Sequence, residues 1–156
     1  MPWRPAETKL KCPSELRRIV EYEKGNGATV VFTNGCFDLL HPGHVQCLER
    51  MCVFDDILIV AVNTDDSFEI VKGRKPLVPF GDRCLMVAAL ECVDYVCLLA
   101  EPTPRELLRL LRPDVLAKGG TSEYPIGHEI VTGYGGRVVV IPTYGDWSSS
   151  RLQNII

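Results

Sequence analysis

The order of apolar and polar positions along this chain divides it into two kinds of segment. Short runs of β-branched and aliphatic residues predict buried parallel strands, and longer amphipathic stretches predict helices. Strands are expected at residues 29–33, 56–62, 95–98, 115–117 and 137–141. Helices are expected at residues 14–22, 42–51, 81–91, 104–111 and 127–134, with a closing helix from Ser149. Because the two kinds alternate, we predict a single α/β domain with a Rossmann-like open parallel sheet of about five strands and helices on both faces.

The ends of these elements carry further signals. Residues 1–13 are spaced by prolines, so we expect an N-terminal arm that precedes a folded domain of residues 14–156. Ser14 is expected to cap the first helix, which stops at the glycine-rich turn of residues 25–27. A long loop with several basic residues is expected after the second strand.

Composition narrows the class of protein and its partners. The chain is 46% hydrophobic and 24% charged, which is ordinary for soluble globular proteins. No apolar run approaches the roughly 20 residues of a membrane span, and the first residues lack the apolar stretch of a signal peptide. We therefore expect a cytoplasmic protein without membrane insertion. Seventeen basic and 20 acidic residues give a net charge of −3, which argues against nucleic acid as a partner.

The seven cysteines form no C-x-x-C pair, and most of them lie within apolar stretches. This pattern favours reduced, buried thiols over a zinc site or a disulfide framework. Their positions are Cys12, Cys36, Cys47, Cys52, Cys84, Cys92 and Cys97.

The segment of residues 30–44 carries the strongest chemical signal. A β-branched strand leads into a glycine-containing turn, and His41 and His44 follow where Pro42 marks the start of a helix. A spacing of three places both imidazoles on one side of the first helical turn, beside free backbone N–H groups. Open α/β folds hold phosphate at this edge of the sheet. Capping histidines and metal ligands are the alternatives, although the sequence places no third ligand near them.

Attack on the α-phosphate of a nucleotide, with pyrophosphate leaving, is the chemistry that fits these groups. Its transition state needs positioning and positive charge on the phosphoryl oxygens more than covalent help. Imidazolium forms of His41 and His44, with the dipole of the helix that they begin, are expected to supply both.

Basic residues recur near the predicted carboxyl edge of the sheet. Lys118 and two glycines directly follow the strand of residues 115–117, which directs the lysine toward the crevice there. Lys72, Arg74 and Lys75 lie in a loop bounded by glycine and proline, for which a solvated surface loop is the competing interpretation.

Two helix starts carry the remaining candidates. Arg83 lies in the first turn of a predicted helix, where the dipole disfavours a cation unless an anion binds there. Three serines open the last helix, where they either cap it or accompany a bound anion that offsets Arg151 in the first turn. They are Ser148, Ser149 and Ser150.

These segments together resemble the HxGH nucleotidyltransferase superfamily, and the resemblance runs from about Ser14 to the C-terminus. The block of residues 32–44 is its most specific part. Within the superfamily, the chain looks most like the adenylyltransferase domain that activates heptose 1-phosphate for lipopolysaccharide assembly, a domain that occurs alone or fused to a heptose kinase. The supporting segments are residues 33–38, 61–65, 94–96, 103–104 and 113–120.

The resemblance implies an enzyme, with residues 14–156 as its nucleotidyltransferase domain. It would transfer AMP from ATP, or a nucleotide from another triphosphate, to a sugar 1-phosphate, with D-glycero-D-manno-heptose 1-phosphate as the expected acceptor. An ADP-sugar and pyrophosphate would be the products. Mg²⁺ would assist, the protein would supply no metal ligands of its own, and a homo-oligomer is expected.

The resemblance also implies roles for individual residues. His41 and His44 would stabilise the pentacovalent α-phosphate, and Lys72 would neutralise phosphate charge as the third catalytic residue. Asp38 and Arg83 would bind the acceptor substrate. The nucleotide-binding set would comprise Phe32, Thr33, Asn34, Gly43, Lys118, Gly119, Ser148, Ser149 and Ser150.

Three features depart from the family pattern, and one of them is a final helix that stops at Ile156, earlier than usual. Thr121 and Ser122 stand where an aspartate and a tyrosine usually follow Lys-Gly-Gly, and Trp147 replaces a small residue before the serines. They leave the nucleotide base and the sugar open. A cytidylyltransferase that uses CTP and glycerol 3-phosphate or phosphoethanolamine is the alternative enzyme, disfavoured by Lys-Gly-Gly and by Trp147. A catalytically silent nucleotide-binding module is disfavoured because both histidines and the phosphate lysine are present.

Overall fold

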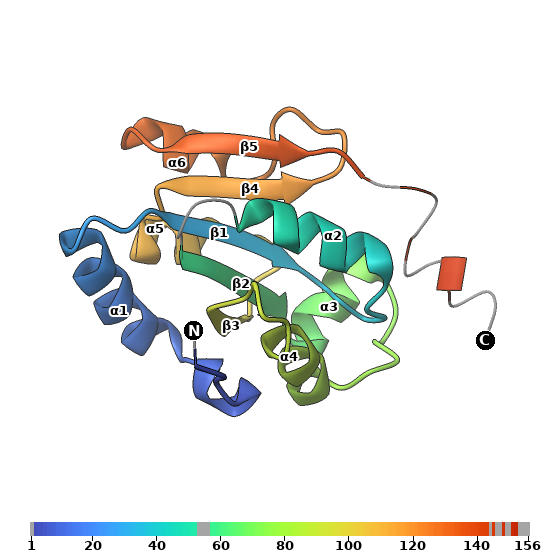
Figure 1. The fold of residues 1–156 in the computed structure, drawn as a ribbon. Helices are drawn as coiled ribbons and strands as arrows, with labels where there is room; N and C mark the ends of the chain where they lie inside the picture. Colours follow the sequence, from blue (N-terminus) through green and yellow to red (C-terminus); the bar gives the residue numbers. More distant parts are fainter. Residues whose placement is uncertain (1, 53–56, 144, 146–147, 149–150, 153–156) are drawn as a thin grey trace.

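Five parallel strands form one sheet in the order β3-β2-β1-β4-β5 (Figure 1). The computed structural model describes residues 2–52, 57–143, 145, 148 and 151–152. The strands are β1 (Val30–Gly35), β2 (Ile57–Asn63), β3 (Tyr95–Leu99), β4 (Val115–Gly119) and β5 (Arg137–Ile141). The chain runs outward from β1 to β3 and then returns to the other side of β1 for β4 and β5. This order confirms the predicted Rossmann-like parallel sheet.

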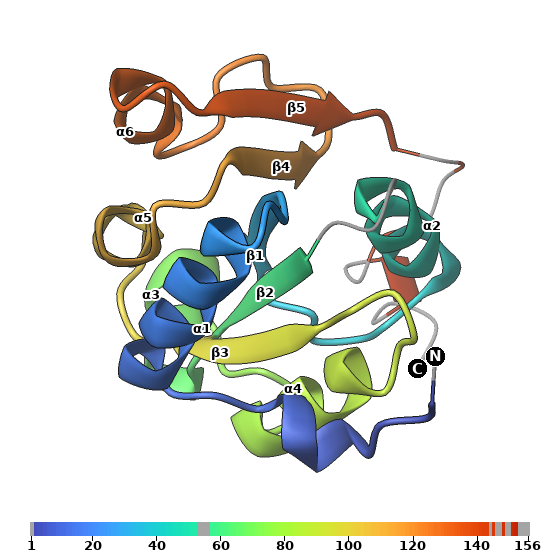
Figure 2. The same cartoon turned by 60° about the vertical axis from the view of Figure 1, so that its left-hand side comes forward.

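Helices cover both faces of this sheet. They are α1 (Pro13–Gly25), α2 (Pro42–Met51), α3 (Asp65–Lys72), α4 (Phe80–Ala88), α5 (Arg105–Leu111) and α6 (His128–Gly133). The helices α1, α5 and α6 pack on one face, and α2 and α4 pack on the other (Figure 2). The helix α3 follows β2 directly and therefore lies at the carboxyl end of the sheet.

Side chains that alternate along the strands divide the core into two layers. On β2, Leu58, Val60 and Val62 face the layer of α2 and α4, whereas Ile59 and Ala61 face the layer of α1 and α5. All five side chains are fully buried, as expected for a central parallel strand with helices on both faces. Packing on both faces thus fixes the ends of the strands. The positions of the residues that directly follow the strands are fixed with them.

The segment after β2, predicted as a long loop, contains the helix α3. Thr64 caps this helix, because its Oγ1 accepts a hydrogen bond from the N–H of Ser67 at 3.2 Å. Gly73 ends it in the left-handed conformation, with φ of 72°. Both residues are ordinary signals of a helix boundary. The helix was not predicted because the basic, proline-containing stretch that follows it is typical of a loop. Lys72 is therefore the last residue of a helix rather than a loop residue.

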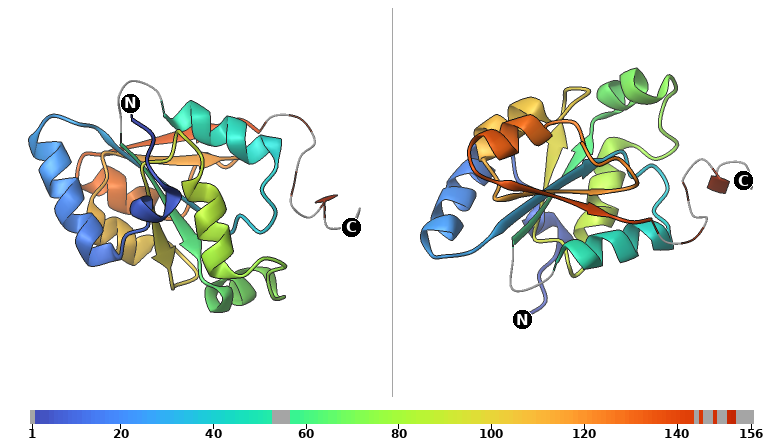
Figure 3. Two further views of the ribbon diagram at one scale, coloured as in Figure 1. Left: turned by 60° about the horizontal axis from the view of Figure 1, so that its bottom comes forward. Right: turned by 90° about the horizontal axis from the view of Figure 1, so that it is seen from above.

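The N-terminal residues pack against the sheet, in contrast to the predicted free arm. A 3-10 helix, η1 (Ala6–Lys9), lies beside α4 (Figure 3). Leu10 forms a parallel bridge with Val96 of β3, and the N–H of Lys11 donates to the Val96 carbonyl at 2.9 Å. The sequence pattern missed this contact because it joins residues far apart in the chain.

Other boundaries differ by a few residues. The helix α1 begins at Pro13 with Cys12 as its N-cap, and the N–H of Cys12 donates to Glu15 at 3.3 Å, so the predicted Ser14 cap is wrong. The strands β1 and β4 each run two residues further than predicted. Those extensions matter because they carry Asn34 and Lys118.

The cysteines are free, as predicted, and two of them are fully in the core. Burial raises the pKa of Cys84 to about 11 and that of Cys97 to about 12, so both thiols stay protonated at neutral pH. Within the described part of the chain, no helix is long and apolar enough to cross a bilayer.

Candidate functional site

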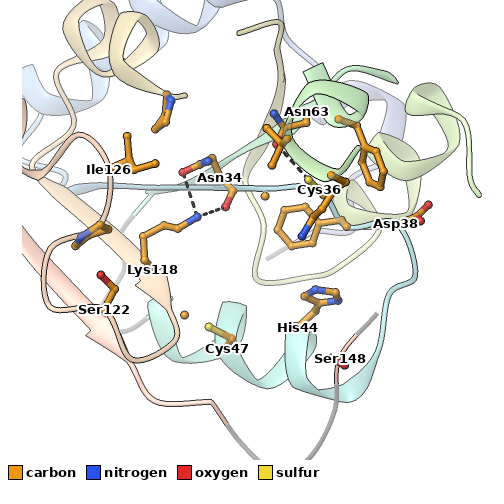
Figure 4. Close-up of a pocket in the computed structure, with 18 of the residues that line it drawn as sticks. Asn34, Cys36, Asp38, His44, Cys47, Asn63, Lys118, Ser122, Ile126 and Ser148 are labelled. Atoms are coloured by element: carbon orange, nitrogen blue, oxygen red, sulfur yellow. Dashed lines mark hydrogen bonds between the residues drawn. The ribbon is translucent and has the colours of Figure 1, made fainter. Parts of the chain in front are cut away.

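A cavity of about 660 Å³ opens at the carboxyl ends of the strands, lined by the last residues of β1 and β4 (Figure 4). These two strands are neighbours in the sheet but not in the sequence, so the strand order reverses here. In open α/β sheets, ligands bind outside such a reversal. Of the predicted site residues, the cavity is lined by Asn34, Asp38, His41, Gly43, His44, Lys72, Lys118, Gly119 and Ser148.

His41 and His44 cap the start of α2 for each other. His41 is the N-cap residue, and its Nδ1 accepts from the N–H of His44 at 3.3 Å. The Nδ1 of His44 accepts from the N–H of His41 at 3.4 Å, and the rings stack with centroids 3.7 Å apart. Because both Nδ1 atoms accept, each neutral ring carries its proton on Nε2. The pair therefore offers two N–H donors at the N-terminus of a helix.

Burial keeps both rings uncharged near neutral pH. It lowers the pKa of His44 to about 4, and the charge of His41 acts in the same direction. Burial also lowers the pKa of His41, which is 8% exposed. The predicted imidazolium forms therefore require a bound anion. The rings are neutral hydrogen-bond donors, and an anion beside them would favour their protonation.

The turn before α2 depends on the position of Phe37. This residue has a left-handed φ of 49°, and its ring centroid lies 5.1 Å from that of His44. A Cβ on Gly35 would lie 2.8 Å from the Phe37 ring. Glycine is thus required at the end of β1 so that the aromatic ring can pack beside the imidazole.

Lys118 reaches from β4 to the end of β1. Its Nζ donates to the Asn34 carbonyl at 2.6 Å and to the Asn34 Oδ1 at 3.3 Å. Burial lowers the pKa of Lys118. Beside it, a Cβ on Gly119 would lie 2.7 Å from the Sγ of Cys47, so β4 approaches α2 as closely as glycine permits. In Figure 4 the lysine lies between the β4–α6 loop and α2, as the prediction of a crevice lysine requires.

The end of α3 brings further positive charge to the cavity. Lys72 is exposed and lines it, and so does Arg74. Asp38, predicted to bind the acceptor, is 2% exposed and forms an ion pair with Arg74 at 3.1 Å. In the structure its carboxylate therefore binds a residue of the chain itself.

Among the described residues of the predicted site, three do not line the cavity. Phe32 is fully buried in the core beneath α1 and α5, and Thr33 is 4% exposed. Both lie before the carboxyl end of β1, where helices cover each face of the strand. Arg83 is also fully buried, and its Nη2 pairs with Asp65 at 2.8 Å. That carboxylate, rather than a bound anion, offsets the cation in the first turn of α4, so the structure does not bring these residues to the cavity.

Ser148 reaches the cavity from the C-terminal segment. Its Oγ accepts from the N–H of Arg151 at 3.1 Å, which is the bond of an N-cap serine. The predicted contacts of Ser149 and Ser150, and the effect of Trp147, lie outside the described residues.

The cavity also contains residues that sequence reasoning missed. Asn63 ends β2, and Tyr124 and Ile126 belong to the β4–α6 loop. Tyr124 is 70% exposed and Ile126 is 54% exposed, which makes this side of the cavity apolar as well as open. In Figure 4, Ile126 and Ser122 lie across Lys118 from Asp38. The sequence did carry a signal for this side of the cavity, namely the large apolar residues in the loop that follows Lys-Gly-Gly.

The described cavity wall does not form a metal site of its own. Asp38 is its single carboxylate among these residues, and both of its oxygens accept hydrogen bonds from the segment of residues 74–78. Among the residues that the structure describes, no cluster of histidine, cysteine, aspartate or glutamate could hold an ion. Mg²⁺ prefers phosphate and water oxygens to such a wall.

Comparisons with known proteins agree on the family to which this chain is similar. Residues 32–154 match the family model described as cytidylyltransferase-like. The protein named bifunctional protein HldE from Trichlorobacter lovleyi is 46% identical over 152 residues, which cover 96% of this chain and 31% of the relative. Its namesake from Geobacter metallireducens is 44% identical over 154 residues, covering 97% of this chain and 31% of the relative. The chain thus spans just under a third of the length of these curated relatives.

A solved structure has the same fold. It is the lipopolysaccharide core biosynthesis protein from Thermoplasma volcanium GSS1, with a TM-score of 0.62 and 23% sequence identity. The match covers 74% of this chain and 96% of that one. At this identity the likeness concerns the fold alone.

Proposed function

The chain belongs to the cytidylyltransferase-like family, and from that membership we propose that it is a nucleotidyltransferase that transfers AMP from ATP to a sugar 1-phosphate. The expected acceptor is D-glycero-D-manno-heptose 1-phosphate, and the products are an ADP-sugar and pyrophosphate. Identity of about 45% to HldE proteins over nearly the whole chain supports this reaction. So does the resemblance of residues 33–38 and 113–120 to heptose 1-phosphate adenylyltransferase domains.

One observation carries the proposal: His41, His44, Lys118 and Ser148 line the same cavity although they come from distant parts of the chain. If the imidazoles had faced away from Lys118, there would be no common site for an anion. The cavity is large enough for a small-molecule ligand, since such pockets measure about 300–1,000 Å³.

The neutral histidines suit the proposed step. The attacking group is a phosphate monoester oxygen, which is already ionised near pH 7 because the second pKa of such a phosphate is about 6. No general base is needed to remove a proton from it. The Nε2–H groups of His41 and His44 can therefore act as donors to the α-phosphoryl oxygens, where negative charge must be stabilised in the transition state.

The other residues supply charge and orientation. The N-terminus of α2, where Gly43 lines the cavity, adds the positive end of a helix dipole. Lys118 and Lys72 add positive charge to the cavity. These groups would hold the triphosphate in place before the reaction, so little reorganisation is required when charge shifts to the leaving pyrophosphate.

Mg²⁺ enters this proposal only with the triphosphate. The described wall offers it no carboxylate that is not already hydrogen bonded to the chain. The phosphate oxygens and water would be its ligands, and it would supply positive charge on the leaving group.

A substrate panel tests the proposal. Pyrophosphate release is measured with ATP, CTP and GTP, each combined with heptose 1-phosphate, glycerol 3-phosphate and phosphoethanolamine. We expect release with ATP and the sugar phosphate, and mass spectrometry should detect the ADP-sugar. Activity with CTP and glycerol 3-phosphate or phosphoethanolamine would favour the cytidylyltransferase instead. Binding of nucleotide without release in any combination would indicate a silent module.

A further inference from the structure

The buried carboxylate of Asp38 joins the turn after β1 to the segment after α3. Its Oδ1 accepts from the N–H of Leu77 at 2.8 Å and from that of Val78 at 3.1 Å. Its Oδ2 accepts from the Nη1 of Arg74 at 3.1 Å. Only 2% of the Asp38 side chain is exposed. This carboxylate is therefore arranged to hold the segment of residues 74–78 rather than to meet a ligand.

Arg74 differs from Asp38 because it is anchored and still accessible. Its side chain is 38% exposed and lines the cavity. Nη1 makes a second bond to the Lys75 carbonyl at 3.0 Å, and the guanidinium carbon lies 5.1 Å from the centroid of the Phe68 ring. Nε and Nη2 have no hydrogen-bond partner among the described residues. One edge of the guanidinium is thus fixed, and the other donors remain available.

We propose that Arg74 binds the polyphosphate of the nucleotide and that Asp38 is the positioning residue that orients it. The inference rests on the proposed function, because the polyphosphate is that of the triphosphate substrate. A guanidinium recognises phosphate through paired N–H donors in a fixed plane. The Asp38 carboxylate and the Phe68 ring fix that plane before the ligand arrives, so less side-chain freedom is lost on binding.

The same carboxylate also holds the backbone that follows Arg74. Asp38 holds the N–H groups of Leu77 and Val78, and these residues follow the end of α3 closely in the chain. Loss of the carboxylate would free the segment after Gly73, which carries Arg74. The positioning role therefore extends beyond the single ion pair.

Equilibrium binding of inorganic pyrophosphate and of ATP tests the role of Arg74. The Arg74→Ala variant should bind both about tenfold more weakly, because a hydrogen-bonded charge partner is removed. Lys75→Ala is the matched control: this cation is a neighbour in the same segment and is exposed, but it does not line the cavity. It should change affinity by less than about twofold, since exposed charges are screened. Equal weakening in the two variants would overturn the inference.

Two variants of Asp38 test the positioning role. Asp38→Asn keeps an oxygen acceptor and loses the charge, whereas Asp38→Ala loses both. Hydrogen exchange at the Leu77 and Val78 amides should be faster in Asp38→Ala, and pyrophosphate affinity should fall toward that of Arg74→Ala. The double variant Asp38→Asn/Arg74→Ala should bind no more weakly than Arg74→Ala. Additive losses in the double variant, or weaker binding with unchanged amide exchange in Asp38→Ala, would show that Asp38 acts directly on the ligand.

These measurements separate the inference from the function that it rests on. Binding and amide exchange are read without turnover. If the substrate panel fails to release pyrophosphate, the proposed reaction is rejected and the Arg74→Ala and Lys75→Ala comparison still stands. If the panel succeeds and those two variants bind alike, the inference alone is rejected.

Discussion

Arg83 and Lys118 are both cations near the carboxyl end of the sheet, but their surroundings assign them opposite tasks. Arg83 is fully buried, and its Nη1 donates to the carbonyls of Cys36 at 2.7 Å and Asn63 at 2.8 Å. Its remaining nitrogens donate to Val78 and to the Asp65 carboxylate. Among the described residues, Lys118 makes hydrogen bonds to Asn34 alone, and it lines the cavity.

This difference shows that the position of a cation near the carboxyl end of the sheet does not by itself identify it as a ligand contact. The guanidinium of Arg83 donates hydrogen bonds to backbone carbonyls at the ends of β1 and β2. It therefore links the two strand ends that border the site. The ammonium of Lys118 keeps access to the cavity. Substitution of the first should therefore affect stability, and substitution of the second should affect ligand binding.

The largest expected effect is on the stability of an Arg83→Met variant. The change leaves three backbone carbonyls without their donor. Each buried polar group left unsatisfied costs about 1–3 kcal/mol, so a loss of several kcal/mol is expected. Urea unfolding measures the loss. Arg109→Met is the control, because its ion pair with Glu106 is exposed on both sides and should contribute less than about 1 kcal/mol. A stable Arg83→Met protein with weakened nucleotide binding would show that Arg83 acts in ligand binding rather than in stability.

The next effect is on turnover in a His44→Ala variant. Loss of a preorganised donor to the α-phosphoryl group should lower kcat about 10²–10³-fold. Circular dichroism should show an intact fold, since the side chain contributes one capping bond. His128→Ala is the matched control, because His128 does not line the cavity. An unchanged rate in His44→Ala would remove the histidine pair from the mechanism.

A smaller effect is the loss of stability in acid. The pKa of His44 is near its ordinary 6.5 in the unfolded chain and about 4 in the folded protein, so the unfolded chain binds more protons between these values. Stability therefore falls as the pH drops from 6.5 toward 4, by about 1–2 kcal/mol between pH 7 and pH 5 for this group. Urea unfolding at the two pH values should show a smaller loss in His44→Gln. An equal loss in both proteins would assign the acid sensitivity to other groups.

The smallest effect is expected for Lys118→Met. The variant should keep most of its stability and bind pyrophosphate about tenfold more weakly, as expected when one charged hydrogen-bond partner is lost. Isothermal titration calorimetry measures the affinity. Lys24→Met is the control, because Lys24 pairs with Asp114 outside the cavity. Greater unfolding in Lys118→Met than in Arg83→Met would contradict the division of tasks described above.

Much of the fold could be predicted because the strands are continuous apolar runs. The block of residues 30–44 also placed both histidines correctly at the start of α2, since Pro42 and the spacing of three are local signals. Lys118 was placed correctly because the residue that follows a buried parallel strand must emerge at the sheet edge.

The points on which prediction and structure differ share another cause: each depends on contacts between distant segments. Whether Arg83 meets a ligand or carbonyls depends on the ends of β1 and β2. Whether Phe32 meets a nucleotide depends on which helices cover β1. The charge of His44 depends on burial in the assembled site. Local patterns locate such side chains along an element, but they do not determine their partners or their protonation.

The bridge between Leu10 and Val96 also has a consequence for the outer strand. Sheet edges with unpaired backbone groups recruit strands from other molecules. Here β3 is the last strand on its side, and the N–H of Lys11 occupies one of its carbonyls. A protein shortened to begin at α1 would expose that carbonyl at an open edge and gain a tendency to self-associate. Expression of this domain alone is therefore best started ahead of η1.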